Sequence, residues 1–189
     1  MTIAIRPATP QDAPGIAAVR IDAWRSTYRG LIPDTYLDGM QLEQSTALWD
    51  RVLTAGANTT SVFVAQNDGD VVGFAAGNML QEPRFDLDAE LSAAYVRREF
   101  QHAGVGRRLV AAVAGAQRAH GAHGLIVWVI AGNKGARAFY EQLGATLLVE
   151  QPFEWDGMPL VEAGYGFADI DALIEATGTM PGPTGSIAH

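Results

Sequence analysis

The chain has 189 residues, of which 48% are hydrophobic and 18% are charged, and it contains no cysteine. This length and composition predict one folded domain and exclude disulfides and thiolate nucleophiles. The formal net charge of −8 argues against a nucleic-acid partner, because phosphate binding needs a basic face. No apolar run approaches the roughly 20 residues of a membrane helix and no signal-peptide pattern is present, so we expect a cytoplasmic protein without membrane contact.

The first quarter of the chain predicts a strand followed by helices. Thr9 can cap a helix, Pro10 suits its first turn, and Asp12 can close a capping box. Further along, Gly30 and Pro33 interrupt an aromatic segment and predict a loop with a short helical turn. In chain order we expect a strand, a helix, this loop and a second amphipathic helix over residues 3–6, 10–26, 24–39 and 42–53.

The middle of the chain predicts an antiparallel sheet. Two β-rich runs, residues 61–66 and 71–77, flank Asp68-Gly69, which is a strong hairpin signal. After a polar connection at 81–89, residues 90–96 are expected to form a third strand. The small residues at 92–94 suit either a bulge or a close ligand, or they simply pack.

The second half predicts alternating helices and strands. Residues 125–131 form a nearly continuous apolar run, as expected for a strand covered on both faces. Asn133 can cap the next helix, and Gly144 stands where that helix would end. We expect helices over 104–120 and 136–143 and closing strands over 145–150 and 160–167. The domain therefore spans residues 1–170, followed by a tail at 171–189 that is rich in Gly and Pro beyond residue 177.

Residues 101–107, Gln-His-Ala-Gly-Val-Gly-Arg, lie between the strand ending at Val96 and an amphipathic helix. Glycines let backbone amides approach a ligand, and a helix N-terminus presents free N–H groups at the positive end of its dipole. Together they suit a pyrophosphate, although a lone Gly-x-Gly also occurs in ordinary turns. Neither a Walker A loop nor a dinucleotide fingerprint is present, because Leu109 stands where the latter needs glycine.

These segments resemble the GCN5-related N-acetyltransferase superfamily. Its acyl-CoA motif, Arg/Gln-x-x-Gly-x-Gly/Ala after a strand, is matched by Gln101, Gly104 and Gly106. The first strand and helix, the central block and the segment NKGARAFYEQLGA follow in the order of the family. The resemblance implies an α/β (α+β) fold with a mixed, mostly antiparallel sheet, flanked by helices and splayed near its middle. It also implies that acetyl-CoA enters between strands 90–96 and 125–131.

The resemblance implies a role for each part of the donor site. The backbone at the end of the central strand would bind the pantetheine arm, the following loop amides would hold the phosphates, and an arginine would supplement them. Asn133 would contact the arm or the acceptor side, or act only as a helix cap. The implied cofactor-binding residues are Tyr95, Val96, Gln101, His102, Ala103, Gly104, Val105, Gly106, Arg107 and Asn133.

Acetyl transfer needs a neutral amine and a proton for the leaving thiolate. By resemblance, Tyr140 would donate that proton, although it can also simply pack its helix. Glu90 would take the amine proton, although a single glutamate is usually only a solubilising charge. Three nearby acids remain alternatives to Glu90, namely Glu82, Asp86 and Asp88.

The acceptor side of the site is less defined by the sequence. Trp24 and Tyr28 lie where this family places its variable acceptor loop, and they suit either a pocket wall or a small hydrophobic core. The acceptor amine can be a peptide N-terminus, an antibiotic or polyamine, or a small metabolite. A catalytically inert acyl-CoA-binding sensor or assembly module is the alternative. We expect no metal, since the histidine spacing matches no ligand pattern, and a homodimer is possible through residues 145–167 and Leu31.

Overall fold

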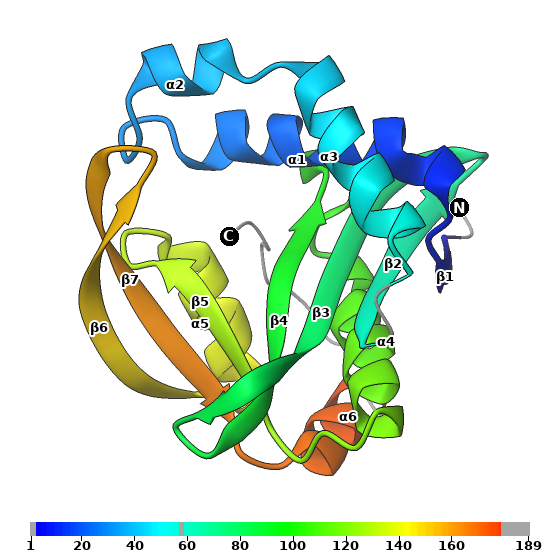
Figure 1. Ribbon diagram of the computed structural model, residues 1–189, viewed down its shortest axis with the longest axis vertical. Helices are drawn as coiled ribbons and strands as arrows, with labels where there is room; N and C mark the ends of the chain where they lie inside the picture. Colours follow the sequence, from blue (N-terminus) through cyan, green and yellow to red (C-terminus); the bar gives the residue numbers. More distant parts are fainter. Residues whose placement is uncertain (1–2, 57–58, 179–189) are drawn as a thin grey trace.

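The computed structural model describes residues 3–56 and 59–178. In this part of the chain, seven strands form one sheet in the order β1-β2-β3-β4-β5-β7-β6 (Figure 1). Neighbouring strands are antiparallel except β4 and β5, which are parallel. The expected mixed, mostly antiparallel sheet is therefore confirmed. The strands are β1 (Ala4–Pro7), β2 (Thr60–Asn67), β3 (Asp70–Arg84), β4 (Leu87–Val96), β5 (Leu125–Ile130), β6 (Thr146–Trp155) and β7 (Met158–Phe167).

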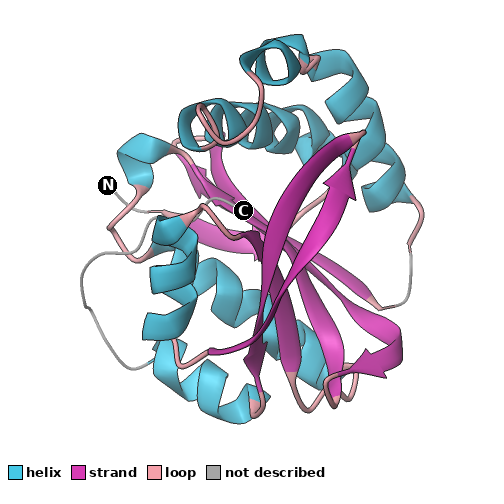
Figure 2. Ribbon diagram, turned by 90° about the vertical axis from the view of Figure 1, so that its left-hand side faces the viewer, coloured by secondary structure: helices cyan, strands magenta, loops and turns pink. Residues whose placement is uncertain are grey.

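Helices cover both faces of the sheet (Figure 2). One face packs against α1 and α3 through a cluster that includes Ile16, Trp49 and Phe74. The other face packs against α4, α5 and α6 through a cluster that includes Leu109 and Phe139. The helices are η1 (Pro10–Asp12), α1 (Ala13–Thr27), α2 (Asp34–Gly39), α3 (Leu42–Thr54), η2 (Arg98–Phe100), α4 (Val105–Ala119), α5 (Lys134–Gln142) and α6 (Ile170–Gly178).

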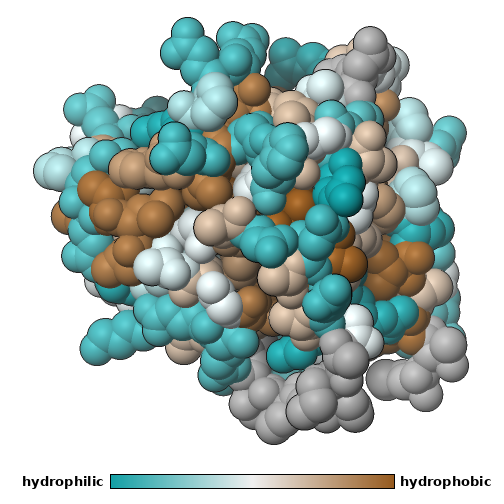
Figure 3. All heavy atoms as spheres, turned by 90° about the horizontal axis from the view of Figure 1, so that it is seen from below, coloured by the Kyte–Doolittle hydropathy of each residue, from teal (hydrophilic) through white to brown (hydrophobic). Residues whose placement is uncertain are grey.

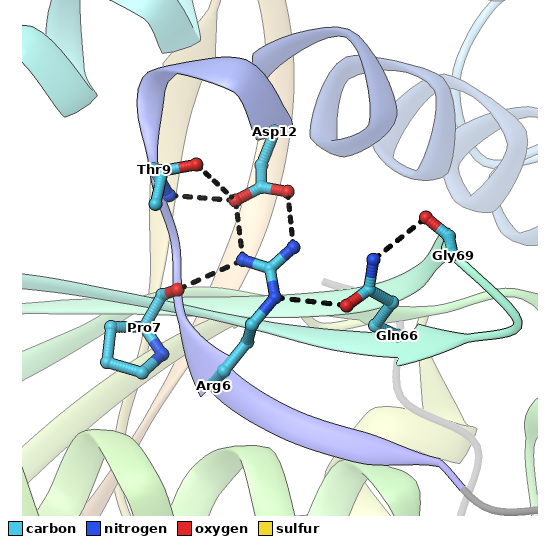
Figure 4. Close-up of polar contacts among 6 residues, drawn as sticks. All are labelled: Arg6, Pro7, Thr9, Asp12, Gln66 and Gly69. Atoms are coloured by element: carbon cyan, nitrogen blue, oxygen red, sulfur yellow. Dashed lines mark hydrogen bonds and ion pairs between the residues drawn. The ribbon is translucent and has the colours of Figure 1, made fainter.

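The entry to α1 is held by a cluster of polar contacts (Figure 4). The carboxylate of Asp12 accepts a hydrogen bond from the Thr9 backbone N–H at 2.8 Å, as the predicted capping box requires. It also accepts two bonds from the Arg6 guanidinium, both at 2.8 Å. Arg6 donates a further bond from Nε to Gln66 on β2. Strands β1 and β2 and the start of α1 are thus joined through one arginine.

The sheet opens in its middle. β4 and β5 share only the pairs Ala89↔Leu125, Glu90↔Ile126 and Leu91↔Val127. Beyond these pairs β4 stays with β3 as far as Val96, and β5 stays with β7 as far as Ile130. The carboxyl-terminal ends of the two parallel strands therefore diverge, which is the splay that the family resemblance implied.

A bulge in β4 lies where the splay begins. The register with β3 shifts between Ala76 and Gly77, so that Ser92 has no residue opposite it. Ser92 instead donates its hydroxyl to the carbonyl of Ala76 at 3.2 Å. In a regular strand, residues three positions apart point to opposite faces. Because of the extra residue, Leu91 and Ala94 instead both belong to the core facing α4. Of the alternatives left open for the small residues at 92–94, a bulge is therefore present.

The prediction of a polar connection at 81–89 is wrong. β3 continues to Arg84 and β4 begins at Leu87, so most of this segment forms a long hairpin. The two turn residues, Phe85 and Asp86, both have positive φ angles, at 54° and 61°. Two-residue hairpin turns of this kind usually carry Asn-Gly or Asp-Gly, so Phe-Asp gave no signal. The hairpin predicted at Asp68-Gly69 is confirmed.

The carboxyl-terminal third is more ordered than expected. β6 extends to Trp155 and meets β7 through an Asp156-Gly157 turn, so it is longer than the predicted strand 145–150. Residues 170–178 form α6, which packs on α4 and buries Ile170 and Leu173 in the core. The predicted tail therefore begins with a packed helix, and residues 179–189 lie outside the described residues.

An exposed apolar area lies on β6 and β7. Seen from below, hydrophobic side chains gather on the side of these two strands (Figure 3). The large exposed hydrophobic residues there include Leu147, Leu148 and Val161. Residues 145–167 are the segment to which the sequence assigned a possible homodimer contact, and that assignment stays a prediction.

Candidate active site

The start of α4 follows the end of β4, the strand that borders the opening to β5. Gly104 is its N-cap residue and has a left-handed backbone, with φ of 74° and ψ of 3°. A Cβ at this position would meet no atom within 4 Å, so the space beside the glycine is open. The first turn of a helix leaves its N–H groups without intrahelical partners. The backbone N–H groups of Val105 and Gly106 therefore lie at the positive end of the α4 dipole.

The remaining predicted loop residues surround this helix start. The Gln101 side-chain amide donates to the carbonyl of Val96 at 3.0 Å and ties the loop to the end of β4. His102 has a positive φ of 62°, and Ala103 beside it is exposed. The Arg107 guanidinium donates to the carbonyl of Ala176 at 2.9 Å, so it lies between α4 and α6.

Asn133 links two elements across the opening. Its side-chain oxygen accepts from the backbone N–H of Ala136 at 3.0 Å, which confirms the predicted helix cap of α5. Its side-chain nitrogen lies 3.3 Å from the hydroxyl of Tyr28, to which it donates. Tyr28 is fully buried at the end of α1. The cap therefore also fixes the distance between α5 and α1.

Tyr140 lies on α5 with no exposed surface. Its ring packs against Phe139 and Phe167, with centroids 5.1 and 6.4 Å away. Burial raises the pKa of Tyr140 well above its usual value, and the nearby Tyr95 and Tyr28 raise it further. The phenol is therefore protonated at neutral pH and can serve as a hydrogen-bond donor.

A cavity of about 510 Å³ lies on the α1–α3 side of the opening. Its floor consists of β4 and β5 residues at and beyond their last shared pairs, including Ser92, Tyr95 and Trp128. Trp24 lines this cavity and donates its indole N–H to the Tyr95 hydroxyl at 2.9 Å. Tyr28 packs edge-on behind Trp24, with ring centroids 5.0 Å apart, and is not among the lining residues.

Glu90, which the sequence analysis predicted as the base, lines this cavity. Burial is the main cause that raises the pKa of Glu90; Glu162 raises it further and Arg84 opposes the rise. Of the three alternative acids, Glu82 and Asp86 are exposed on the β3–β4 hairpin. Asp88 instead accepts hydrogen bonds from the backbone N–H groups of His123 and Gly124.

Several lining residues escaped the sequence analysis. Arg20 carried no signal of its own within the predicted helix 10–26, Arg84 fell in the expected polar connection at 81–89, and Trp128 lay in the apolar run 125–131. Glu162 gave only a weak signal, as a carboxylate within the predicted strand 160–167. The residues that were missed are Arg20, Trp49, Arg84, Trp128, Trp155 and Glu162.

Comparison with known families agrees with this architecture. The model of the acetyltransferase (GNAT) family matches residues 21–145. The chain belongs to this family. It is 35% identical over 172 residues to an uncharacterized N-acetyltransferase, YuaI, of Bacillus subtilis, with 90% of this chain and 96% of the relative covered. A probable N-acetyltransferase of Mycobacterium tuberculosis is 31% identical over 147 residues, covering 74% of this chain and 78% of the relative.

Solved structures of GNAT proteins share the fold at lower identity. PaiA N-acetyltransferase from Thermoplasma acidophilum, in complex with coenzyme A, superposes with a TM-score of 0.68 at 20% identity, covering 86% of this chain and 98% of that one. The putative acetyltransferase yncA from Salmonella typhimurium, with its cofactor acetyl-CoA, gives 0.65 at 19%, covering 89% and 95%. Within residues 3–56 and 59–178, no helix is long and apolar enough to cross a membrane.

Proposed function

We propose that this GNAT protein transfers an acetyl group from acetyl-CoA to a primary amine by direct attack. The observation that carries the proposal is the opening between β4 and β5, with α4 packed on one face of the sheet and the cavity containing Glu90 on the other. A thioester held in that opening would have its donor portion on one side and an acceptor amine on the other. Family membership supports the reaction class.

The residues around the opening fit a coenzyme A substrate. The open space beside Gly104 allows a phosphate to approach the backbone, and the first-turn amides of α4 at Val105 and Gly106 favour its negative charge. The loop residues Gln101, His102 and Ala103 continue this cradle. The divergence of β4 from β5 beyond Leu91 supports a path for the pantetheine arm along the backbone at Tyr95 and Val96.

Two side chains suit the proton transfers. The amine nitrogen attacks the thioester carbonyl, so that an N–C bond forms and the C–S bond breaks. Glu90 takes the proton that the amine must lose, and its raised pKa makes it a better base than an exposed glutamate. Tyr140 donates to the departing thiolate, and both groups return to their starting states by exchange with solvent. The chain has no cysteine to carry an acetyl-enzyme.

An acceptor screen with acetyl-CoA tests this function. Because the protein has no thiol of its own, a thiol-reactive dye reports only the coenzyme A released. We expect release that depends on a primary amine and that yields its N-acetyl product by mass spectrometry. Tight binding of acetyl-CoA with no release for any amine would contradict the proposal and favour the inert sensor or assembly module.

A glycine variant tests the location of the donor site. Gly104→Ala places a methyl group in the open space, and we expect the dissociation constant of acetyl-CoA in calorimetry to rise at least about tenfold. Gly121→Ala is the matched control, because Gly121 also has a positive φ and open space but lies just beyond the other end of α4. Equal affinities for the two variants would show that the cradle lies elsewhere.

A further inference from the structure

The cavity beside Glu90 is walled by indole rings. The four tryptophans of the chain all line it, at positions 24, 49, 128 and 155. The Trp24 and Trp155 rings lie 5.5 Å apart, and Trp128 lies so close to β7 that a Cβ on Gly164 would be 2.8 Å from it. Rigid aromatic walls of this kind favour a flat apolar group between them.

Two guanidinium groups lie on these walls. The Arg20 guanidinium carbon is 4.8 Å from the centre of the Trp24 ring, and that of Arg84 is 4.8 Å from the centre of the Trp128 ring. Stacking on an indole holds a guanidinium in place while its N–H groups stay available. The cavity therefore carries two positioned cations in a protein whose net charge is −8.

Both arginines keep their N–H groups available to a ligand, although the charge of Arg84 also acts on Glu90. Within residues 3–56 and 59–178, the side chains of Arg20 and Arg84 form no ion pair and no hydrogen bond, whereas Arg6, Arg29, Arg118 and Arg137 each pair with a carboxylate. Arg20 is half-buried, and electrostatic attraction is stronger where water is partly excluded. Arg84 is exposed, so the cavity offers one half-buried and one exposed guanidinium to an anionic group on the ligand.

The same cavity has a negative side. Glu90 on β4 and Glu162 on β7 both line it, and they lie close enough for Glu162 to raise the pKa of Glu90. Glu162 is oriented by Gln151, whose side-chain amide donates to it at 2.8 Å. The cavity therefore offers two cations, two carboxylates and aromatic walls.

We propose that the acceptor is a small zwitterion with an aromatic or similarly flat apolar side group, as in an aromatic α-amino acid. This inference rests on the proposed acetyl transfer and names its substrate class. The amine lies beside Glu90, the carboxylate contacts Arg20 and Arg84, and the ring lies between the indoles. A polyamine fits less well, because it would bring additional positive charge beside two arginines that form no ion pair among the described residues.

The test compares acceptors that differ in one group. L-Phenylalanine and phenethylamine share the ring and the primary amine, and only the former has a carboxylate. We expect kcat/KM to favour L-phenylalanine over phenethylamine by roughly ten- to a hundredfold, which is the usual range for one or two charged hydrogen bonds. Spermidine should be a poorer acceptor than either.

Arginine variants identify the origin of that preference. Arg20→Met and Arg84→Met keep an apolar stem on the indoles but remove the charge. We expect the double variant to bring the ratio between the two acceptors close to one, mainly by weakening L-phenylalanine. The two amines differ in basicity, but this difference is the same for every variant, so it cancels when the acceptor ratio of the double variant is compared with that of the wild type. Arg118→Met is the control, because Arg118 is exposed, pairs with Asp171 and lies outside the cavity.

The outcomes separate this inference from the proposed function. If phenethylamine or spermidine is acetylated at least as well as L-phenylalanine, or if the double variant leaves the ratio unchanged, the substrate class is wrong and acetyl transfer stands. If no amine releases coenzyme A, the proposed function fails. The substrate class is then decided by calorimetric binding of L-phenylalanine and phenethylamine to the protein saturated with coenzyme A. Tighter binding of L-phenylalanine that disappears in the double variant supports the substrate class. Equal binding of the two compounds overturns it.

Discussion

The Arg6–Asp12 contact allows a quantitative prediction of stability. In Asp12→Asn the charge of Asp12 is lost while the shape of the side chain is kept. The Arg6 guanidinium is the main cause that lowers the pKa of Asp12 from 3.8 to about 2, and the Thr9 hydrogen bonds add to this effect. At about 1.36 kcal/mol per pH unit, this difference corresponds to about 2.4 kcal/mol of folding free energy at neutral pH. Because the Arg6 side chain is 34% exposed, screening by water reduces the expected loss to about 1–2 kcal/mol.

The pH dependence has a definite sign. The pKa of Asp12 is lower in the folded state than in the unfolded state, so its stabilisation is complete above about pH 4 and is lost as the pH falls towards 2. Urea unfolding at pH 7 should show the full difference between wild type and Asp12→Asn, and at pH 3 about half of it. Asp38→Asn is the control, because its pair with Arg29 is exposed on both sides and we expect no measurable change. A difference that stays constant from pH 7 to 3 would refute the reasoning.

Three further predictions concern the site. Tyr140→Phe should lower kcat by tenfold or more while the dissociation constant of acetyl-CoA stays within about twofold, and unchanged kcat would remove Tyr140 as the acid. Glu90→Gln should lower kcat by about a hundredfold or more and abolish the acidic limb of the pH–rate profile, which in the wild type should lie above the usual glutamate range because the pKa of Glu90 is raised. Gly164→Ala should displace the Trp128 ring, lower the free energy of unfolding in urea by about 1–3 kcal/mol and raise the KM for the acceptor. Gly115→Ala on α4 is the control, because the space beside Gly115 is open. We expect this variant to be neutral or stabilising by up to about 1 kcal/mol.

Local chemistry made much of the fold predictable. The helix cap at Asn133, the capping box at Thr9 and the Asp68-Gly69 turn each depend on residues within a few positions of one another, and all three are present. The Phe85-Asp86 turn was not predicted, because phenylalanine rarely adopts a left-handed backbone, although aspartate tolerates it. The Asp156-Gly157 turn between β6 and β7 carries the same Asp-Gly signal as the turn at Asp68-Gly69.

The cavity that we propose binds the acceptor depends on information that a single segment does not contain. Arg20, Glu90 and Glu162 come from one helix and two strands, and they meet only because β5 lies between β4 and β7 in the sheet. The bulge at Ser92 also changes which β4 side chains face the cavity. Small residues in a sequence indicate that a bulge is allowed, but the register that creates it comes from the partner strand.

The arrangement of the four tryptophans has a practical consequence for finding the acceptor. Because all of them line one cavity, nearly all of the intrinsic fluorescence of the protein originates there, with no tryptophan elsewhere to contribute background. Indole emission responds to the polarity and the quenching groups around the ring. A ligand without an indole that fills the cavity should therefore change the emission of the unlabelled protein. Candidate acceptors can therefore be ranked by titrating them against the tryptophan fluorescence before any turnover is measured.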